Sequence, residues 1–144
     1  MRLAARLVLA IYGLLALSCF AVACSGSRTS PLVALGDSVP RGTDCDCRPY
    51  PLLSANDLAA ATNRSVSATN DAVAGATSAT VLGQLSSDGA VIDHVRTADA
   101  VEIEVGANDV GHTKSCGTAV DCYAPRLPSL ERNLTAIVSR ARAS

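Results

Sequence analysis

The chain has 144 residues, the length of one ordinary domain, and its 12 basic and 13 acidic residues give a formal net charge of -1. No run of like charges is present, so the sequence lacks the basic surface that a nucleic acid or an anionic lipid requires of its partner. Aromatic residues make up only 3% and Trp is absent, which excludes the stacking platforms on which single-stranded nucleic acids bind, and we expect no nucleic-acid partner.

The first segment has the pattern of a targeting leader. Arg2 and Arg6 precede an apolar stretch over residues 7–23, which is typical of a signal peptide or an uncleaved anchor. The residues around Cys24 fit a small-x-small cleavage site and also a loose lipobox in which Cys24 carries a lipid, and both alternatives stay open. We expect a protein that is secreted or held at the cell envelope, in contact with the membrane through the leader or a lipid anchor. The predicted segments are a leader over 1–24, a Ser-rich tether over 25–30 and one domain over 31–144.

Apolar spacing predicts alternating strands and helices through the rest of the chain. Short apolar or alternating runs predict strands at residues 31–35, 65–73 and 100–105. Helical spacing predicts helices at residues 50–62, 78–85, 91–95 and 125–143, with a loop over 37–49. Because strands that alternate with helices form parallel sheets covered by helices, we expect an α/β fold.

Two details of these elements carry further expectations. Thr77 or Ser78 is expected to cap the second of the predicted helices, because a hydroxyl there can accept a free backbone N–H. Glu102 and Glu104 alternate with apolar residues in the third strand. One face of that strand is therefore expected to be wet or to have polar partners.

Four cysteines remain after the leader, an even number that suits an oxidising compartment. Cys116 and Cys122 close a short loop and are the expected local disulfide. A bridge between Cys45 and Cys47 is a second option, although it demands a strained small ring. A zinc site is the alternative, but neither close pair has zinc-knuckle spacing and only His112 lies nearby. We expect no metal.

Each predicted strand is followed by residues that could take part in a reaction. They lie at the sheet edge where ligands of parallel sheets bind. Ser38 follows the first strand, and a Ser at such a turn has the exposed hydroxyl that an acyl-transfer nucleophile needs. Gly75 brings a backbone N–H close to a substrate oxygen, and the Asn108 amide can donate a second hydrogen bond. Taken singly, the three residues fit a turn cap, a strand-to-helix turn and an Asx turn equally well.

Together, in the order Ser, Gly, Asn, the three motifs resemble the sequence blocks of the SGNH (GDSL-type) hydrolase family. The blocks are LGDS at residues 35–38, AVAGAT at 72–77 and VGAND at 105–109. The resemblance implies a three-layer α/β/α flavodoxin-like fold, no cofactor, and hydrolysis of an acyl ester through a covalent acyl-enzyme. It implies Ser38 as the nucleophile, with the Ser38 N–H, the Gly75 N–H and the Asn108 side chain as the oxyanion hole. The implied substrate is a small-molecule, lipid or sugar ester, and we expect a monomer.

The family also carries a histidine base in an Asp-x-x-His block, and this sequence departs from the family there. His94 falls in a predicted short helix, where a surface polar residue is expected, and residues 109–112 spell Asp-x-x-His but overlap the third block. We therefore expect the catalytic His and Asp to be absent from this chain and the fold to be incomplete at its C-terminus. Two readings stay open: a fragment of an active esterase or lipase-like enzyme, and an inactive truncated envelope protein that retains the pocket.

Overall fold

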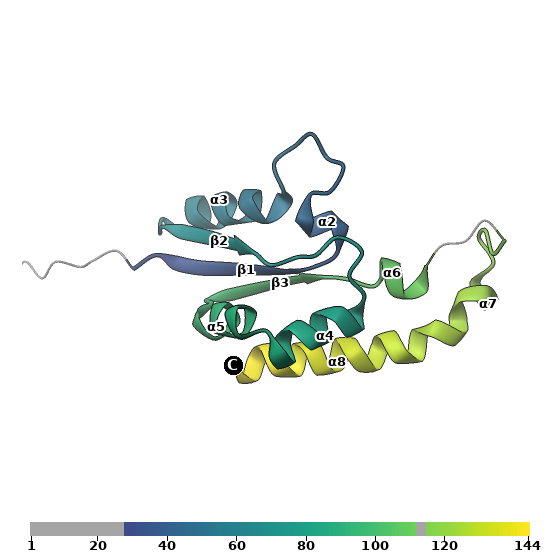
Figure 1. The fold of residues 1–144 in the computed structure, drawn as a ribbon. Helices are drawn as coiled ribbons and strands as arrows, with labels where there is room; N and C mark the ends of the chain where they lie inside the picture. Colours follow the sequence, from purple (N-terminus) through teal and green to yellow (C-terminus); the bar gives the residue numbers. More distant parts are fainter. Residues whose placement is uncertain (1–27, 112–114) are drawn as a thin grey trace, which may run out of the picture.

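A parallel sheet of three strands forms the centre of the computed structural model, which describes residues 28–111 and 115–144. The strands lie in the order β2-β1-β3, so that β1 is in the middle of the described sheet (Figure 1). They are β1 (Ser30–Gly36), β2 (Val66–Asn70) and β3 (Ala100–Glu104). All three were predicted. The leader, the first half of the tether and His112 lie outside the described residues.

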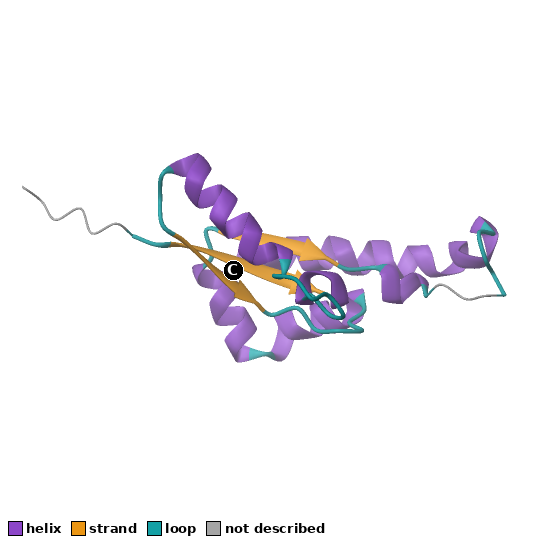
Figure 2. Cartoon of the chain, turned by 90° about the horizontal axis from the view of Figure 1, so that it is seen from above, coloured by secondary structure: helices purple, strands orange, loops and turns teal. Residues whose placement is uncertain are grey.

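Helices cover both faces of the sheet and make the three-layer arrangement that the resemblance implies. One face carries α3 (Tyr50–Thr62), and the opposite face carries α4 (Ser78–Ser87), α5 (Gly89–Thr97) and α8 (Leu127–Ala143), as Figures 1 and 2 show. The α/β/α prediction is therefore confirmed, with an incomplete sheet. Within residues 28–111 and 115–144, no helix is long and apolar enough to cross a bilayer.

Three short helices and one 3-10 turn escape the sequence prediction. They are α2 (Ser38–Arg41), α6 (Ala107–Val110), α7 (Val120–Tyr123) and η2 (Ala124–Arg126). Each is about one turn long, too short to show a helical period in its apolar residues. The predicted loop over 37–49 is accordingly wrong at its start, where α2 forms. The last helix begins at Leu127 instead of residue 125, because the chain first makes the 3-10 turn.

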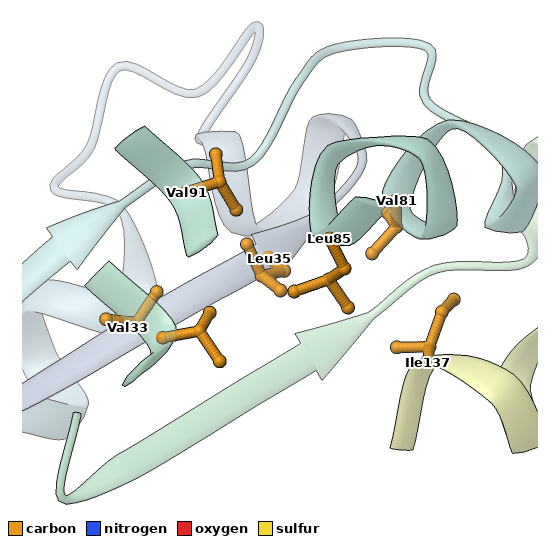
Figure 3. Packing of buried hydrophobic residues seen from close by; sticks show 7 residues of the cluster. Val33, Leu35, Val81, Leu85, Val91 and Ile137 are labelled. Carbon is orange, nitrogen blue, oxygen red and sulfur yellow. The ribbon is translucent and has the colours of Figure 1, made fainter. Parts of the chain in front are cut away.

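The core lies between the sheet and the helices α4, α5 and α8. Val33 and Leu35 are two residues apart in β1, so both project toward this face, and both are almost fully buried. Ile137 of α8 is 0% exposed and closes the cluster from below the sheet (Figure 3). The cluster contains Val33, Leu35, Val81, Leu85, Val91, Val95 and Ile137. It is this packing that fixes the carboxyl ends of the strands relative to α4 and α8.

β2 ends three residues earlier than predicted because of one side chain. The side-chain Oδ1 atom of Asn70 accepts a hydrogen bond from the backbone N–H of Ala72 at 3.2 Å, and this bond turns the chain out of the strand. The Asn70 amide nitrogen donates to the carbonyl of Pro40 at 2.7 Å. The end of β2 is thereby joined to α2.

Tyr50 supplies the partner that the acidic face of β3 was expected to need. Its hydroxyl makes a hydrogen bond with Glu104, and Glu102 also lies within electrostatic reach. Burial, followed by that hydrogen bond, raises the pKa of Tyr50 far above its ordinary value, since both favour the neutral phenol. The Glu102 Oε2 atom is buried without a hydrogen-bond partner in the described part of the chain.

The expected disulfide and the second option are both present. Cys116 and Cys122 are bonded with their Cα atoms 5.7 Å apart, and Cys45 and Cys47 close the small ring with theirs 5.0 Å apart. Sulfur atoms in disulfides cannot act as thiolate ligands, so the zinc alternative for these four cysteines is wrong. Among the described residues, no group of three or more His, Cys, Asp or Glu side chains is arranged to hold a metal ion.

Candidate active site

Ser38 is the first residue of α2 and comes directly after the β1 turn. The buried Asp37 caps this helix, its carboxylate accepting the N–H of Val39 at 3.0 Å. Ser38 itself is partly buried, and neither its hydroxyl nor its backbone N–H makes a hydrogen bond within the described residues. The side chain is therefore free to react and the N–H beside it is free to donate.

Gly36 holds this turn tightly against β3. The N–H of Asp37 donates to the carbonyl of Glu104 at 3.2 Å. A Cβ atom at Gly36 would lie 2.0 Å from that same carbonyl oxygen, and the φ of 146° is one that only glycine adopts readily. The first loop therefore lies as close to the end of β3 as two backbones can.

Gly75 lies in a loop that is bonded to the first one. The N–H of Val73 donates to the Gly36 carbonyl at 2.9 Å, and the N–H of Ala76 donates to Val73 at 3.0 Å, which closes a turn. Gly75 occupies the position of this turn with a positive φ of 78°. It is exposed, and its N–H has no acceptor within the described residues. Gly75 thus presents a free donor to solvent beside the Ser38 loop.

Asn108 lies on α6 and is bonded to the loop of Gly75. Its amide nitrogen donates to the carbonyl of Ala76 at 2.9 Å. Since a side-chain amide has two N–H donors, this bond leaves one free to donate to a substrate oxygen. The structure therefore brings together the three loops of Ser38, Gly75 and Asn108, while their catalytic roles stay predictions.

A partly buried polar network behind this edge was missed by the sequence analysis. The carboxylate of Asp109 accepts the backbone N–H of Ser78 at 2.7 Å and also the Ser78 hydroxyl. The amide of Asn133 in α8 donates to the same hydroxyl at 2.9 Å. Thr77 caps α4, as one of the two expected residues, through Thr80. Ser78 instead connects α4, α6 and α8.

The network has a direct bearing on Asn108. Asp109 follows Asn108 in the chain, so its anchoring to Ser78 fixes the backbone of α6 beside the start of α4. Each oxygen of the carboxylate accepts one hydrogen bond from Ser78. His112 lies outside the described residues, so the Asp-x-x-His reading of residues 109–112 stays as the sequence left it.

No histidine reaches Ser38 in the described part of the chain. His94 projects from α5, 43% exposed, and its Nδ1 atom lies 2.8 Å from Asp71 Oδ2. It is more than a surface polar residue, because this contact joins α5 to the chain just after β2. The helix α5, which carries His94, lies on the same face of the sheet as α4 and α8 (Figure 1), and His94 makes no hydrogen bond with Ser38 within the described residues.

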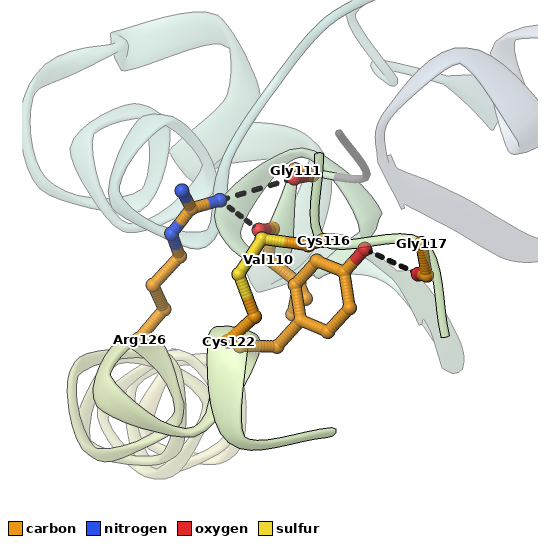
Figure 4. The surroundings of a disulfide bond; sticks show 7 residues. Val110, Gly111, Cys116, Gly117, Cys122 and Arg126 are labelled. Atoms are coloured by element: carbon orange, nitrogen blue, oxygen red, sulfur yellow. Dashed lines mark hydrogen bonds between the residues drawn. A yellow bond between two sulfur atoms is a disulfide. The ribbon is translucent and has the colours of Figure 1, made fainter. Parts of the chain in front are cut away.

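The loop closed by Cys116 and Cys122 is attached to the end of α6. The Arg126 guanidinium donates to the carbonyls of Val110 and Gly111, the latter at 3.1 Å (Figure 4). The Tyr123 hydroxyl donates to Gly117 at 2.7 Å inside the loop. These bonds hold the segment after Asn108 to the start of α8.

Comparison with known proteins gives one family and one fold. The model of the family described as "GDSL-like Lipase/Acylhydrolase family" matches residues 34–144. No curated protein matches the chain significantly.

Several solved structures share the fold at low sequence identity. The lipase Lip_vut3 from a goat rumen metagenome is 18% identical with a TM-score of 0.68, over 80% of this chain and 57% of its own. The SGNH-hydrolase family esterase AlinE4 is 18% identical with a TM-score of 0.59, over 81% and 55%. The psychrotrophic esterase EstA from Pseudoalteromonas sp. is 22% identical with a TM-score of 0.53, over 79% and 54%. The chain thus spans a little over half the length of each.

Proposed function

The chain belongs to the GDSL-like lipase/acylhydrolase family, and from that premise we propose that it provides the nucleophile and oxyanion hole of a serine-dependent ester hydrolase. The observation that carries the proposal is the convergence of three loops at one edge of the sheet. Hydrogen bonds from Val73 to Gly36 and from Asn108 to Ala76 join these loops. The free hydroxyl of Ser38 lies at the first of them.

The proposed reaction follows the chemistry of an acyl-enzyme. The Ser38 oxygen attacks the ester carbonyl, and a histidine base of the kind that the family carries, which none of the described residues supplies, takes the hydroxyl proton. The carbonyl oxygen becomes an oxyanion, which the N–H groups of Ser38 and Gly75 and the free amide N–H of Asn108 stabilise. The bond to the alcohol then breaks, and the alcohol leaves with the proton. Water attacks the acyl-enzyme in the same way and releases the acid and Ser38.

A second candidate is an envelope protein that retains the pocket without turnover. It is favoured by the observation that no histidine contacts Ser38 within residues 28–111 and 115–144. An oxyanion hole without its base retains roughly 10³ to 10⁴ of rate enhancement over water in serine proteases, far below a working enzyme. The two candidates therefore differ in the measured rate, whereas both predict that ester binds at this edge.

Hydrolysis of p-nitrophenyl acetate tests the enzyme proposal. We expect release of p-nitrophenol by a protein in which the family's histidine base completes this site, and its loss in Ser38→Ala. Ser67→Ala, at an exposed residue of β2, is the control and is expected to retain the wild-type rate. Equal turnover by the Ser38→Ala variant would refute Ser38 as the nucleophile.

Covalent labelling gives a second, independent readout. The similar esterase EstA is inhibited by monoethylphosphonate, so we propose an ethyl fluorophosphonate as the probe. Ser38 attack on phosphorus with loss of fluoride would add one ethylphosphonyl group to the intact mass. Ser67→Ala should be labelled and Ser38→Ala should not. A label found on another serine would contradict the assignment.

Export to the cell envelope is the remaining part of the proposal. The basic and apolar pattern of residues 1–24 supports a leader, and two disulfides suit an oxidising compartment. Metabolic labelling with a fatty acid separates the two forms. A labelled wild type and an unlabelled Cys24→Ser variant indicate a lipoprotein, and an unlabelled protein in the medium indicates simple secretion. Retention in the cytoplasm would contradict export.

A further inference from the structure

A groove of about 390 Å³ opens beside Ser38, between α2, the loop that follows it and the start of α3. Its walls are mainly apolar and include the Cys45–Cys47 disulfide, Pro49 and the ring of Tyr50, and the exposed Arg48 adds one charged side chain to the lining. Val39 and Leu53 also line it, with 54% and 45% of their surfaces exposed. Two large apolar side chains thus face solvent directly next to the nucleophile.

The walls of this groove are held in place before any ligand arrives. Gly42 ends α2 in the left-handed conformation and packs against Pro49, where a Cβ atom would come within 2.8 Å of the proline ring. The N–H of Thr43 donates to the Ser38 carbonyl at 3.0 Å. The disulfide shortens the loop beyond this point. A preformed wall needs little ordering when a ligand binds, which favours affinity.

We propose that this groove holds the acyl group of the ester, and that this group is apolar. The proposal rests on Ser38 being the nucleophile. Covering Val39 and Leu53 with an apolar group removes their surface from water, which favours binding. The volume lies within the roughly 300 to 1,000 Å³ typical of small-molecule sites, so it has room for an acyl chain of several carbons.

The chemistry of the acyl-enzyme selects the acyl group over the alcohol. The acyl carbon stays bonded to the Ser38 oxygen until water releases it, whereas the alcohol leaves in the first half of the reaction. A fixed concave wall that includes Ser38 therefore suits the group that remains attached. The alcohol needs a path to solvent, which the incoming water can also use.

Two series of esters test the assignment. The acyl series is p-nitrophenyl acetate, butyrate and octanoate, and the alcohol series is ethyl, butyl and octyl acetate. Leu53→Trp fills the groove, and Leu127→Trp is the matched control because Leu127 is also 45% exposed but lies on α8. We expect kcat/KM to rise from acetate to butyrate in the wild type, because the longer acyl group covers more of the apolar wall. Leu53→Trp should lower the ratio of kcat/KM for butyrate to kcat/KM for acetate by about tenfold or more. Leu127→Trp should leave both values unchanged.

A second variant works in the opposite direction. Leu53→Ala widens the groove and should shift the preference from butyrate toward octanoate. Hydrolysis with the same acyl preference in all variants would overturn the groove assignment and leave the ester hydrolase proposal standing. If the Leu53 variants changed kcat/KM only in the alcohol series, the groove would hold the alcohol that leaves, and the assignment to the acyl group would be wrong.

Binding provides the readout if no ester is hydrolysed, a result that would contradict the proposed activity of this chain. Titration with butyrate, followed by the backbone amide resonances of Val39, Thr43 and Leu53, tests the groove alone. Shifts in the wild type and in Leu127→Trp that vanish in Leu53→Trp support the proposal. Absence of shifts in the wild type would overturn it.

Discussion

The carboxylate of Asp109 and the backbone N–H of Ser78 are joined by a 2.7 Å hydrogen bond between residues 31 positions apart in the chain. Through this bond the helix α6, which carries Asn108, is anchored to the start of α4 beside the loop of Gly75. The position of Asn108, a proposed oxyanion donor, therefore depends on a partly buried contact between two other residues.

Removal of the Asp109 carboxylate should destabilise the protein. Ser78 is fully buried, so Asp109→Ala leaves its N–H without an acceptor, at a cost of about 1–3 kcal/mol in the free energy of unfolding. Asp109→Asn keeps one acceptor oxygen and should lose less. The measurement is urea denaturation, with Asp93→Ala as control because that ion pair with Arg96 is exposed and should contribute under about 1 kcal/mol. Equal stability of Asp109→Ala and Asp93→Ala would contradict this prediction.

Gly36 should tolerate no side chain. In Gly36→Ala the new Cβ atom meets the Glu104 carbonyl at 2.0 Å, and the positive φ adds backbone strain, so we expect a loss of at least about 3 kcal/mol in thermal or urea unfolding. Gly83→Ala is the control, since a Cβ atom in this α4 residue has no neighbour within 4 Å. It should stabilise the protein by about 0.5–1 kcal/mol, because alanine favours a helix over glycine. A stable Gly36→Ala variant would show that the β1 turn can move away from β3.

Tyr50 should make the stability of the protein sensitive to alkaline pH. Burial and the hydrogen bond to Glu104 raise its pKa above the ordinary value of 10.0, so the unfolded chain loses the phenol proton first. The stabilisation is complete below pH 10 and decreases as the pH rises above it toward the folded pKa. Melting temperatures at about pH 8 and about pH 11 measure the loss, which Tyr50→Phe should reduce. The same loss in both proteins would refute the role of Tyr50.

The main elements are predictable because their residues carry a clear period. α3 begins and ends at the predicted residues 50 and 62, since prolines stand at its start and Asn63 ends it in the left-handed conformation. β2 is shorter than predicted because the Asn70 side chain turns the chain. That effect depends on Pro40, which is 30 residues away, and no local pattern reports it.

In the candidate site, too, some features can be predicted from the sequence and others cannot. Ser38, Gly75 and Asn108 each follow a strand, and position in the chain is enough to find them. Asp109 and Ser78 become partners only when α6 meets α4, so their contact is a property of the tertiary structure. The Cys45–Cys47 ring is visible in the sequence, but its place in the wall of the groove beside Ser38 is not.

The ties between the loops have a consequence for how such a protein diverges in evolution. The bonds from Val73 to Gly36 and from Asp37 to Glu104 join main-chain atoms, which every residue except proline supplies. Mutations of most side chains therefore leave this frame intact, and Gly36 is the exception because of its close approach. Substitutions can change the side chains that line the groove while the loops around Ser38 keep their positions. Structures only 18% identical to this chain can retain the same fold for this reason.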